Sequence, residues 1–215
     1  DLEVVDVTGD FQPDVLVSCK LCDGSVVYGN SHGVFSPLAG AIPAASNNYE
    51  FEAMDVDGDG DLDLATINDG GGLKDRLLIN SGFGTFLDQT AARLAGAANP
   101  GEDDNVVVFG DVDADGDPDL LTGSLSGLDR LALNDGAGVF TPATDVAPDD
   151  TPGTLGLGIT DLDGDGRLDL VQGQGEVAFD DKVQLATAMV AIDTAAPRFV
   201  VQQLDVDQIL FEGPH

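Results

Sequence analysis

An acidic segment of nine residues recurs four times along the chain, beginning at residues 6, 55, 111 and 161. These starting points are 49, 56 and 50 residues apart, and the apolar segments between them recur in step. A period of this size indicates a repeated supersecondary unit that cannot bury its apolar face alone and therefore stacks on its neighbours. The chain of 215 residues is thus expected to fold as an array of similar units within one domain.

Each unit contains the same succession of short apolar segments and turns. A strand such as residues 64–67 follows the acidic segment, and a charged turn such as Asp75–Arg76 precedes the next strand, residues 77–80. The sequences NSGFGTF and NDGAGVF then place Asn and Gly at a hairpin turn. The segment ahead of the acidic stretch, such as residues 105–110, supplies a fourth strand, and helical periodicity is not sustained. The sequence therefore predicts an all-β propeller built of four-stranded antiparallel blades.

We expect the propeller to span residues 1–204, with residues 205–215 as a C-terminal tail or linker. The fourth unit lacks the Asn-Gly hairpin and runs KVQLATAMVAIDTAAPRFVVQQL instead. A compact four-bladed ring is our prediction, with pairing of two chains or a place within a larger propeller as alternatives. The expected blades are residues 1–48, 49–104, 105–153 and 154–204.

Three of the acidic segments have the spacing of a calcium loop. In the pattern D-x-D-x-D-G-x-x-D, side-chain oxygens at positions 1, 3, 5 and 9 and the carbonyl of position 7 converge on one hard cation, while glycine at position 6 permits the turn. An EF-hand would need glutamate at position 12, and hairpin turns without metal are the other alternative. The predicted ligands are Asp55, Asp57, Asp59, Asp61 and Asp63; Asp111, Asp113, Asp115, Asp117 and Asp119; and Asp161, Asp163, Asp165, Arg167 and Asp169.

The first acidic segment, DVTGDFQPD, departs from this pattern. Thr8 replaces the second aspartate and Phe11 replaces the turn glycine, so one charge is lost and a side chain enters a sharp turn. Asp6, Asp10 and Asp14 remain as candidate ligands beside Thr8. The sequence therefore predicts about three Ca²⁺ ions, with a fourth site that is weaker or empty.

The net charge of −32, from 40 acidic and 8 basic residues, restricts the partners. Nucleic acids and anionic membrane surfaces are disfavoured because both require clustered Lys and Arg. The natural counterpart is a cation, although adaptation to saline surroundings also explains such acidity. No apolar run is long enough to insert into a membrane, and the N-terminus lacks signal-peptide features. We interpret the chain as a mature or excised soluble piece.

The motifs DVDGDGDLDLATIND, DVDADGDPDLLTGS and DLDGDGRLDLVQGQG, with the hairpins DRLLINSGFGTF and DRLALNDGAGVF, resemble FG-GAP or VCBS-type repeats. That family includes the calcium-binding propeller heads of integrin alpha subunits. The resemblance spans about residues 1–200. It implies loops that join the first two strands of each blade and bind calcium structurally, with recognition surfaces elsewhere. It also implies a secreted or cell-surface setting, often bacterial, although the family commonly closes seven blades rather than four.

Cys19 and Cys22 lie close together in SCKLC. In an extracellular protein this spacing favours a local disulfide. Free thiols, a redox pair and a metal site are the alternatives. No helix start is evident that would lower a thiol pKa, and zinc would need further ligands such as His32 and His215.

Catalytic motifs such as a Ser-His-Asp signature, a phosphate loop or H-E-x-x-H are lacking, and most carboxylates fall in cation loops. A glycosidase pair of carboxylates and a glycan lectin are both weakly supported, the latter because Trp is absent and only 2 Tyr occur. We predict a non-catalytic extracellular module for protein recognition or adhesion, with calcium and an extracellular protein as partners. A structural spacer or an accessory domain of a larger secreted enzyme is the alternative. The acidic connections at residues 96–104 and 145–153 are candidate contact sites or flexible connections.

Overall fold

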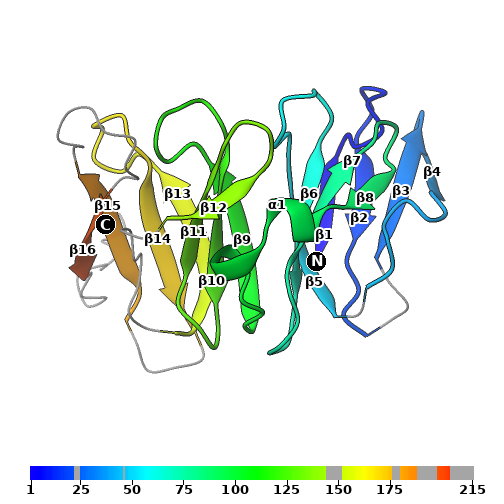
Figure 1. The fold of residues 1–215 in the computed structure, drawn as a ribbon. Helices are drawn as coiled ribbons and strands as arrows, with labels where there is room; N and C mark the ends of the chain where they lie inside the picture. Colours follow the sequence, from blue (N-terminus) through cyan, green and yellow to red (C-terminus); the bar gives the residue numbers. More distant parts are fainter. Residues whose placement is uncertain (22–24, 46, 144–151, 176–179, 188–197, 204–215) are drawn as a thin grey trace, which may run out of the picture.

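The computed structural model describes residues 1–21, 25–45, 47–143, 152–175, 180–187 and 198–203. These residues form sixteen strands, one short helix and one 3-10 turn. The strands make four antiparallel sheets of four strands each, and every sheet uses strands that are consecutive in the chain (Figure 1). The predicted all-β fold of four-stranded antiparallel blades is therefore confirmed.

The four sheets are numbered in chain order. Sheet 1 comprises β1 (Leu2–Val5), β2 (Asp14–Val17), β3 (Val26–Ser31) and β4 (Val34–Pro37). Sheet 2 comprises β5 (Asn48–Met54), β6 (Asp63–Asn68), β7 (Arg76–Asn80) and β8 (Phe86–Asp88). Sheet 3 comprises β9 (Asp104–Gly110), β10 (Asp119–Ser124), β11 (Arg130–Asn134) and β12 (Phe140–Pro142). Sheet 4 comprises β13 (Thr154–Thr160), β14 (Asp169–Gln174), β15 (Lys182–Thr187) and β16 (Arg198–Gln203).

The core lies between successive sheets. Leu16 and Val27 of sheet 1 pack in one cluster with Leu64 and Leu78 of sheet 2, and similar clusters fill the next two junctions. Strands β6 and β10, in the middle of the array, are buried along their whole length. This burial on both faces explains why their apolar residues do not alternate with exposed polar ones. Each sheet is therefore stabilised by its neighbours rather than by its own hairpins.

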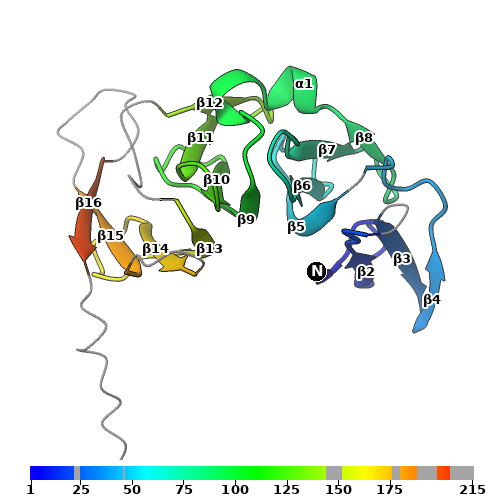
Figure 2. The same cartoon turned by 90° about the horizontal axis from the view of Figure 1, so that it is seen from below.

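The sheets form an open arc instead of a closed ring. Their first strands pack in sequence, β1 against β5, β5 against β9 and β9 against β13. Figure 2 shows sheets 1 and 4 at opposite ends of the arc, with β5, β9 and β13 toward its concave side. The predicted compact four-bladed ring is therefore wrong for the described residues. The inner-strand side chains Phe51 and Phe109 lie in the clusters that fill the junctions, so the curvature of the array depends on how residues from two repeats pack together, which the pattern within one repeat does not specify.

The connection between sheets 2 and 3 is anchored rather than flexible. It contains the helix α1 (Thr90–Arg93) and the 3-10 turn η1 (Gly96–Ala98). The buried Asn99 accepts a hydrogen bond from the amide of Asp75 (3.2 Å) and donates one to its carbonyl (2.8 Å). This part of residues 96–104 is thus structural, which sequence patterning did not predict.

Three predictions fall on residues outside the described ranges. They concern Cys22 of the Cys19–Cys22 disulfide, residues 145–151 of the second acidic connection, and the tail at residues 205–215. All three stay predictions. Among the helices that the structure describes, none combines the length and the apolar character needed to cross a bilayer.

Candidate metal centres

The four acidic segments form loops that join the first two strands of each sheet along one edge of the arc, the upper edge in Figure 1. We number them loop 1 (residues 6–14), loop 2 (55–63), loop 3 (111–119) and loop 4 (161–169), with positions 1 to 9 in each. The hydrogen bonds within them follow one pattern. That pattern distinguishes the aspartates that accept hydrogen bonds from the loop backbone from those whose carboxylates mainly converge on one another.

Position 9 is a buried aspartate in all four loops, and it fastens the loop to the sheet. In loop 2, Asp63 accepts a hydrogen bond from the amide of Val56 (3.1 Å) and another from the amide of Asn80 on β7 (2.8 Å). Burial raises the pKa of Asp63 to about 6, and nearby carboxylates add to the shift while the two amides oppose it. Asp119 has the same contacts in loop 3, and burial likewise raises its pKa to about 6.

Position 1 shapes the turn. The carboxylate of Asp55 accepts hydrogen bonds from the amides of Gly58 (2.9 Å) and Gly60 (3.0 Å). Both glycines have positive φ, 72° and 92°, a backbone conformation that favours glycine. Ala114 occupies the position in loop 3 that corresponds to Gly58 with φ 62°, so the turn tolerates a small side chain there.

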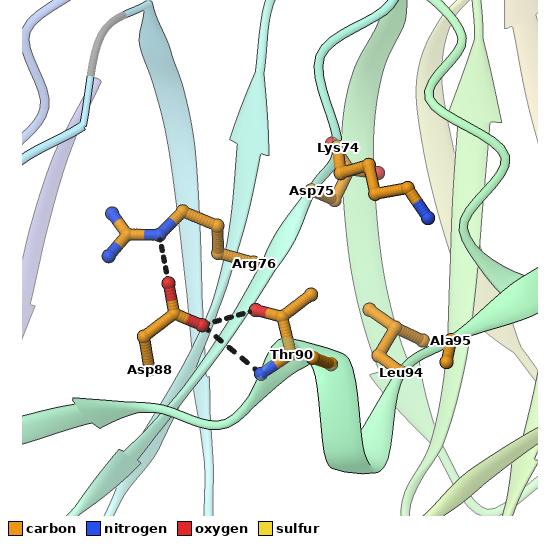
Figure 3. A pocket seen from close by; sticks show the side chains of 8 residues that line it. Lys74, Asp75, Arg76, Asp88, Thr90, Leu94 and Ala95 are labelled. Atoms are coloured by element: carbon orange, nitrogen blue, oxygen red, sulfur yellow. Dashed lines mark hydrogen bonds and ion pairs between the residues drawn. The ribbon is translucent and has the colours of Figure 1, made fainter.

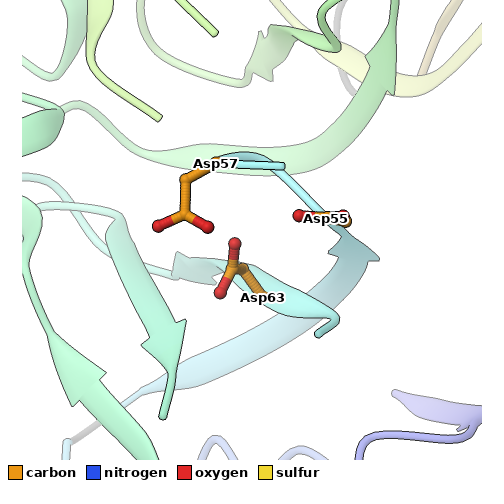
Figure 4. A group of neighbouring side chains, drawn as sticks. All are labelled: Asp55, Asp57 and Asp63. Atoms are coloured by element: carbon orange, nitrogen blue, oxygen red, sulfur yellow. The ribbon is translucent and has the colours of Figure 1, made fainter. Parts of the chain in front are cut away.

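Loop 2 brings three predicted ligands together. Figure 4 shows the carboxylates of Asp55, Asp57 and Asp63 converging, and one oxygen of each lies within 4.8 Å of the others. Two like charges at about 5 Å repel by on the order of 3 kcal/mol at an effective dielectric constant near 20. The Oδ1 atom of Asp57 is also buried without a hydrogen-bond partner. Three converging carboxylates with an unpaired buried oxygen fit a hard cation that prefers oxygen ligands.

Loops 3 and 4 contain equivalent clusters with different members. In loop 3 the cluster is Asp111, Asp113 and Asp115, and in loop 4 it is Asp161, Asp163 and Asp169. Each loop therefore gathers three of the four predicted side-chain ligands. Outside the clusters lie Asp59 in loop 2, Asp119 in loop 3 and Asp165 in loop 4, together with the position-7 residues Asp61, Asp117 and Arg167.

Position 7 was predicted to contribute its carbonyl oxygen. The structure places its amide against the side chain of position 5, with N to Oδ1 distances of 2.9, 3.0 and 2.9 Å for Asp61, Asp117 and Arg167. The guanidinium of Arg167 also pairs with the carboxylate of Asp165. In loop 4, the side chain of Arg167 therefore pairs with Asp165, one of the carboxylates that the sequence predicts as a calcium ligand.

Loop 1 has the same backbone pattern but gathers no cluster of three acidic side chains within the described residues. Asp14 accepts the amides of Val7 (3.1 Å) and Asn30 (2.8 Å), and Asp6 accepts the amide of Phe11 (2.6 Å). Phe11 has φ 65° and a 96% exposed side chain, so it takes the turn conformation that glycine adopts in the other loops. The Thr8 hydroxyl donates to Asp6 at 3.5 Å, and the Thr8 amide donates to Asp14 at 3.0 Å.

Arg93 is a functional candidate that sequence reasoning missed. Its Nη2 atom lies 3.2 Å from Oδ2 of Asp57, and its Nη1 donates to the carbonyl of Ala137 at 2.5 Å. The side chain thus joins loop 2 to the hairpin of sheet 3. The only signal in the sequence was the excess of 40 acidic over 8 basic residues, because any arginine in such a chain is expected to pair with a carboxylate.

A second feature missed from the sequence is a buried charge cluster between sheets 2 and 3. Arg130 lies 2.5 Å from Asp104 and 3.7 Å from Asp75, and both aspartates are buried. Burial and the neighbouring charge of Asp104 raise the pKa of Asp75 to about 8. The charged turn Asp75–Arg76 therefore contributes to a junction between blades as well as to a turn.

A pocket of about 450 Å³ lies beside α1, on residues distinct from the acidic loops (Figure 3). Asp88 receives hydrogen bonds there from the amide and hydroxyl of Thr90, at 3.1 and 2.7 Å, and pairs with Arg76 at 3.0 Å. Hydrogen bonding to Thr90 and the charge of Arg76 lower the pKa of Asp88 against the opposing effect of burial. These polar groups fix the start of the helix.

On the concave side, a pocket of about 320 Å³ is lined by Tyr49, Glu50, Asn105 and Leu155, from the first strands of sheets 2, 3 and 4. Glu50 belongs to a group of carboxylates with Glu3 and Glu52. Burial, with the charge of Glu52, raises the pKa of Glu3 and of Glu50 to about 7. The concave face thus carries carboxylates with raised pKa values, away from the loops.

The FG-GAP-like repeat model matches three overlapping segments, residues 6–66, 55–122 and 111–171. No curated protein matches the chain. Among solved structures, the chain is similar to a lectin of Agrocybe aegerita described for its specific recognition of non-reducing terminal N-acetylglucosamine. The identity is 20% and the TM-score 0.53, over 94% of this chain and 51% of the lectin, so the chain spans about half the length of that protein and the likeness shows the fold. Because the family model covers well over half of the sequence, from loop 1 to β14, the chain belongs to the FG-GAP-like repeat family.

Proposed function

We propose that the chain is a calcium-stabilised, non-catalytic propeller module of a secreted or cell-surface protein, with a role in protein recognition or adhesion. The observation that carries the proposal is the threefold recurrence of an acidic cluster at the same edge of consecutive sheets. A single cluster of exposed acids is common without metal. Three clusters at equivalent positions of a repeat indicate a shared requirement.

The donor set supports calcium over other cations. All the converging ligands are carboxylate oxygens, which suit calcium and magnesium, whereas zinc prefers nitrogen and sulfur. Magnesium demands a near-octahedral shell and keeps its waters, while calcium accepts six to eight oxygens in irregular geometry. The loops supply clustered carboxylates on an irregular turn. Loops of this kind can be tuned to the millimolar calcium of extracellular fluid, which supports the proposed location.

The role that we propose for the ions is structural. In loops 2 and 4, position 9 connects the cluster to the sheet. Asp63 belongs to the loop 2 cluster and accepts the amide of Asn80 on β7, and Asp169 belongs to the loop 4 cluster and accepts the amide of Ala186 on β15. An ion bound by Asp55, Asp57 and Asp63 would therefore hold the first three strands of sheet 2 at one point. Three divalent ions would also reduce the net negative charge of the chain, from −32 to −26.

Recognition is assigned to protein partners rather than to glycans. The acidic surface favours a partner with a basic face, because complementary charge accelerates and orients association. The exposed ring on the concave pocket is Tyr49, and Nζ of Lys20 lies 5.6 Å from its centre, so a sugar would have to displace a cation–π contact. The lectin likeness therefore supports the fold more than the ligand. The alternative role, a structural spacer, needs the calcium sites but no partner.

Calcium titration with matched variants tests the proposal. Asp115→Asn alters position 5 of loop 3, and Asp10→Asn alters position 5 of loop 1, where no cluster forms. Calorimetry should give three calcium ions for the wild type and for Asp10→Asn, and a weakened or lost site for Asp115→Asn. Capture of basic extracellular proteins that depends on calcium would support recognition, while calcium binding without any capture would favour the spacer. Absence of calcium binding at millimolar concentration would contradict the proposal.

A further inference from the structure

The edge of the arc that carries the acidic loops also carries two almost fully exposed phenylalanines. Phe11 in loop 1 is 96% exposed, and Phe83, in the turn that joins β7 to β8, is 84% exposed. They are the most exposed aromatic side chains in the part of the chain that the structure describes. Both residues have positive φ, 65° and 60°, a strained conformation for a residue with a Cβ atom. Strain without compensating burial points to a function outside the fold.

The two rings belong to one unit, loop 1 with the turn of the next sheet, residues 81–85, here hairpin 2. Asn80, which precedes hairpin 2, donates to the carbonyl of Val7 in loop 1 at 2.9 Å. A Cβ atom added to Gly84 would lie 3.1 Å from the side chain of Thr8 and 3.6 Å from the Val7 carbonyl oxygen. Hairpin 2 therefore rests directly on loop 1, and the turns that carry the two rings are neighbours.

The next unit of the array, loop 2 with the turn of sheet 3, residues 135–139, is built in the same way. The side-chain amide that precedes this turn donates to a carbonyl of loop 2 at 2.8 Å. There Gly60 takes the place of Phe11, and Ala137 takes the place of Phe83. Neither ring is therefore required by the shared fold, yet both occur in the same unit.

The carboxylate of Asp61, in loop 2, lies between the two turns. A Cβ atom added to Gly9 of loop 1 would lie 3.8 Å from its Oδ1 atom, and one added to Gly82 of hairpin 2 would lie 3.4 Å from its Oδ2 atom. Asp61 is not a member of the loop 2 cluster. Among the described residues, no donor or cation pairs with this carboxylate. The unit thus combines two exposed rings with a negative charge that is available to a ligand.

Loop 1 holds Phe11 in a defined position. The carboxylate of Asp6 accepts the amides of Gly9 (2.8 Å) and Phe11 (2.6 Å). The side-chain oxygen of Gln12 accepts the amide of His32 at 2.5 Å, which joins the loop to the hairpin of sheet 1. A turn that is fixed before binding loses little conformational freedom when a ligand arrives.

The surroundings of the rings are negatively charged. Asp6 and Asp10 belong to loop 1, where no acidic cluster forms among the described residues and which we expect to stay free of calcium. Their charge therefore remains when the other loops are loaded. A negative site favours a positive ligand and disfavours an anionic membrane surface.

Arginine and lysine side chains match this combination of groups. Their charged ends can pair with a carboxylate while their apolar stems lie along exposed rings, and a cation over a phenyl face gains further attraction. We propose that Phe11, Asp61 and Phe83 form a site for an arginine or lysine side chain of a partner protein. The inference rests on the proposed role in protein recognition and names the chemistry of the partner.

Amide NMR spectra of the calcium-loaded chain test this site with two defined probes. Titration with the peptide acetyl-Gly-Leu-Arg-Leu-Gly-amide should give saturable shifts in loop 1, hairpin 2 and the amides beside Asp61. The matched peptide contains citrulline, which has the shape of arginine without its charge. It should bind about fivefold more weakly, the effect of losing one exposed ion pair. Calorimetry on the same samples counts the bound calcium ions.

Variants of the unit identify the groups that bind. Phe11→Gly and Phe83→Ala each introduce the residue of the neighbouring unit, so both variants should fold. Each should weaken binding of the arginine peptide by about threefold or more. Asp61→Asn should abolish the preference for arginine over citrulline. Leu87→Ala on β8 removes a side chain that is 53% exposed outside the unit, and it should bind like the wild type.

Absence of saturable shifts in a wild type that binds three calcium ions would overturn this inference and leave the calcium proposal standing. Peptide binding by a chain that binds no calcium would support the site and contradict only the calcium proposal. Wild-type affinity in both phenylalanine variants, or equal binding of the two peptides by the wild type, would also overturn the inference. Sedimentation with phosphatidylcholine vesicles adds a last arm. Vesicle binding that depends on Phe11, without peptide binding, would show that the rings insert into a membrane instead.

Discussion

Loop 1 and loop 3 share a backbone hydrogen-bond pattern and differ in charge. In both, a buried aspartate at position 9, Asp14 or Asp119, accepts amides from its own loop and from the third strand of the sheet. In loop 3 alone, Asp111, Asp113 and Asp115 converge within 4.8 Å. Both loops also have an aspartate at position 5, Asp10 or Asp115, that accepts the amide of position 7, so the loop fold uses positions 1, 5 and 9, while the acid at position 3 exceeds what the fold needs. This excess is the charge that we attribute to a bound cation.

The largest expected effect is that of calcium removal. Each ion at a hundredfold excess over its Kd stabilises the native state by about 2.7 kcal/mol, so three independent ions contribute about 8 kcal/mol. Chelation should lower the Tm by roughly 15–30 °C for a domain of this size, and magnesium should restore it poorly. Scanning calorimetry with metal analysis measures this. An unchanged Tm in metal-free protein would contradict the view that the extra acids of loop 3, compared with loop 1, bind a stabilising cation.

Replacing the shared aspartate comes next. Asp14→Ala leaves the amides of Val7 and Asn30 without their acceptor, which should cost about 3 kcal/mol of unfolding free energy with or without calcium. Asp119→Ala should cost more in calcium than in chelator, because loop 3 also loses its cation. Urea denaturation in both conditions provides the measurement. Equal calcium dependence in the two variants would show that loop 1 binds calcium as well.

Loop 1 can be converted into the pattern of loop 3. Thr8→Asp with Phe11→Gly supplies the missing carboxylate and the glycine, and the Phe11 side chain is too exposed for its loss to disturb the core. Calorimetric stoichiometry should rise from three calcium ions to four, adding about 2.7 kcal/mol at a hundredfold excess of calcium. Phe11→Gly alone should add stability of about 0.5–1 kcal/mol without a fourth ion, because φ is positive there. A stoichiometry that stays at three in the double variant would mean that other features decide binding.

A smaller effect is expected at Arg93, whose guanidinium pairs with Asp57 in loop 2. Arg93→Gln removes a positive charge that competes with the ion, and calcium affinity of loop 2 should rise by about threefold to tenfold. Titration is cleanest with loops 3 and 4 inactivated by Asp113→Asn and Asp163→Asn. Arg76→Gln, which breaks a pair with Asp88 away from the loops, is the control. Unchanged or weakened affinity in Arg93→Gln would show that the arginine positions Asp57 for the ion.

The smallest effect concerns Glu3, an acid outside the loops. Its folded pKa of about 7 exceeds the ordinary value of 4.5, so the folded state binds more protons than the unfolded state between these values. The stability that Glu3 contributes should therefore fall as pH rises from about 4.5 to 7. Glu3→Gln should raise the Tm by a few degrees at pH 8 and by little at pH 5, in calcium at both. A pH-independent difference would contradict the assigned cause.

Local pattern in the sequence was enough to predict the blades and the shared turn. The period near 50 residues, the Asn-Gly hairpins and the glycines of the loops each act within one repeat, and the four sheets follow them. Closure was different. It depends on how successive sheets pack on one another, and each junction brings together residues of two repeats, such as Leu16 with Phe51 and Ile67 with Phe109.

The same distinction applies to the candidate sites. Spacing identified the acidic loops, yet it could not show that Asp119 is committed to two amides or that Asp165 is paired with Arg167. Both contacts depend on which neighbouring groups the fold places within hydrogen-bond distance of the carboxylate. Arg93 approaches Asp57 from a helix in another connection, so no spacing within the loop could have revealed it.

Anomalous scattering from crystals grown in calcium would locate the ions directly. Three peaks of similar occupancy are expected, with no peak between Asp6 and Asp14. They should lie at the three acidic clusters: Asp55, Asp57 and Asp63; Asp111, Asp113 and Asp115; and Asp161, Asp163 and Asp169. Four equal peaks would show that loop 1 binds despite Thr8 and Phe11. No peak at any loop would contradict the assignment of the excess carboxylates to calcium.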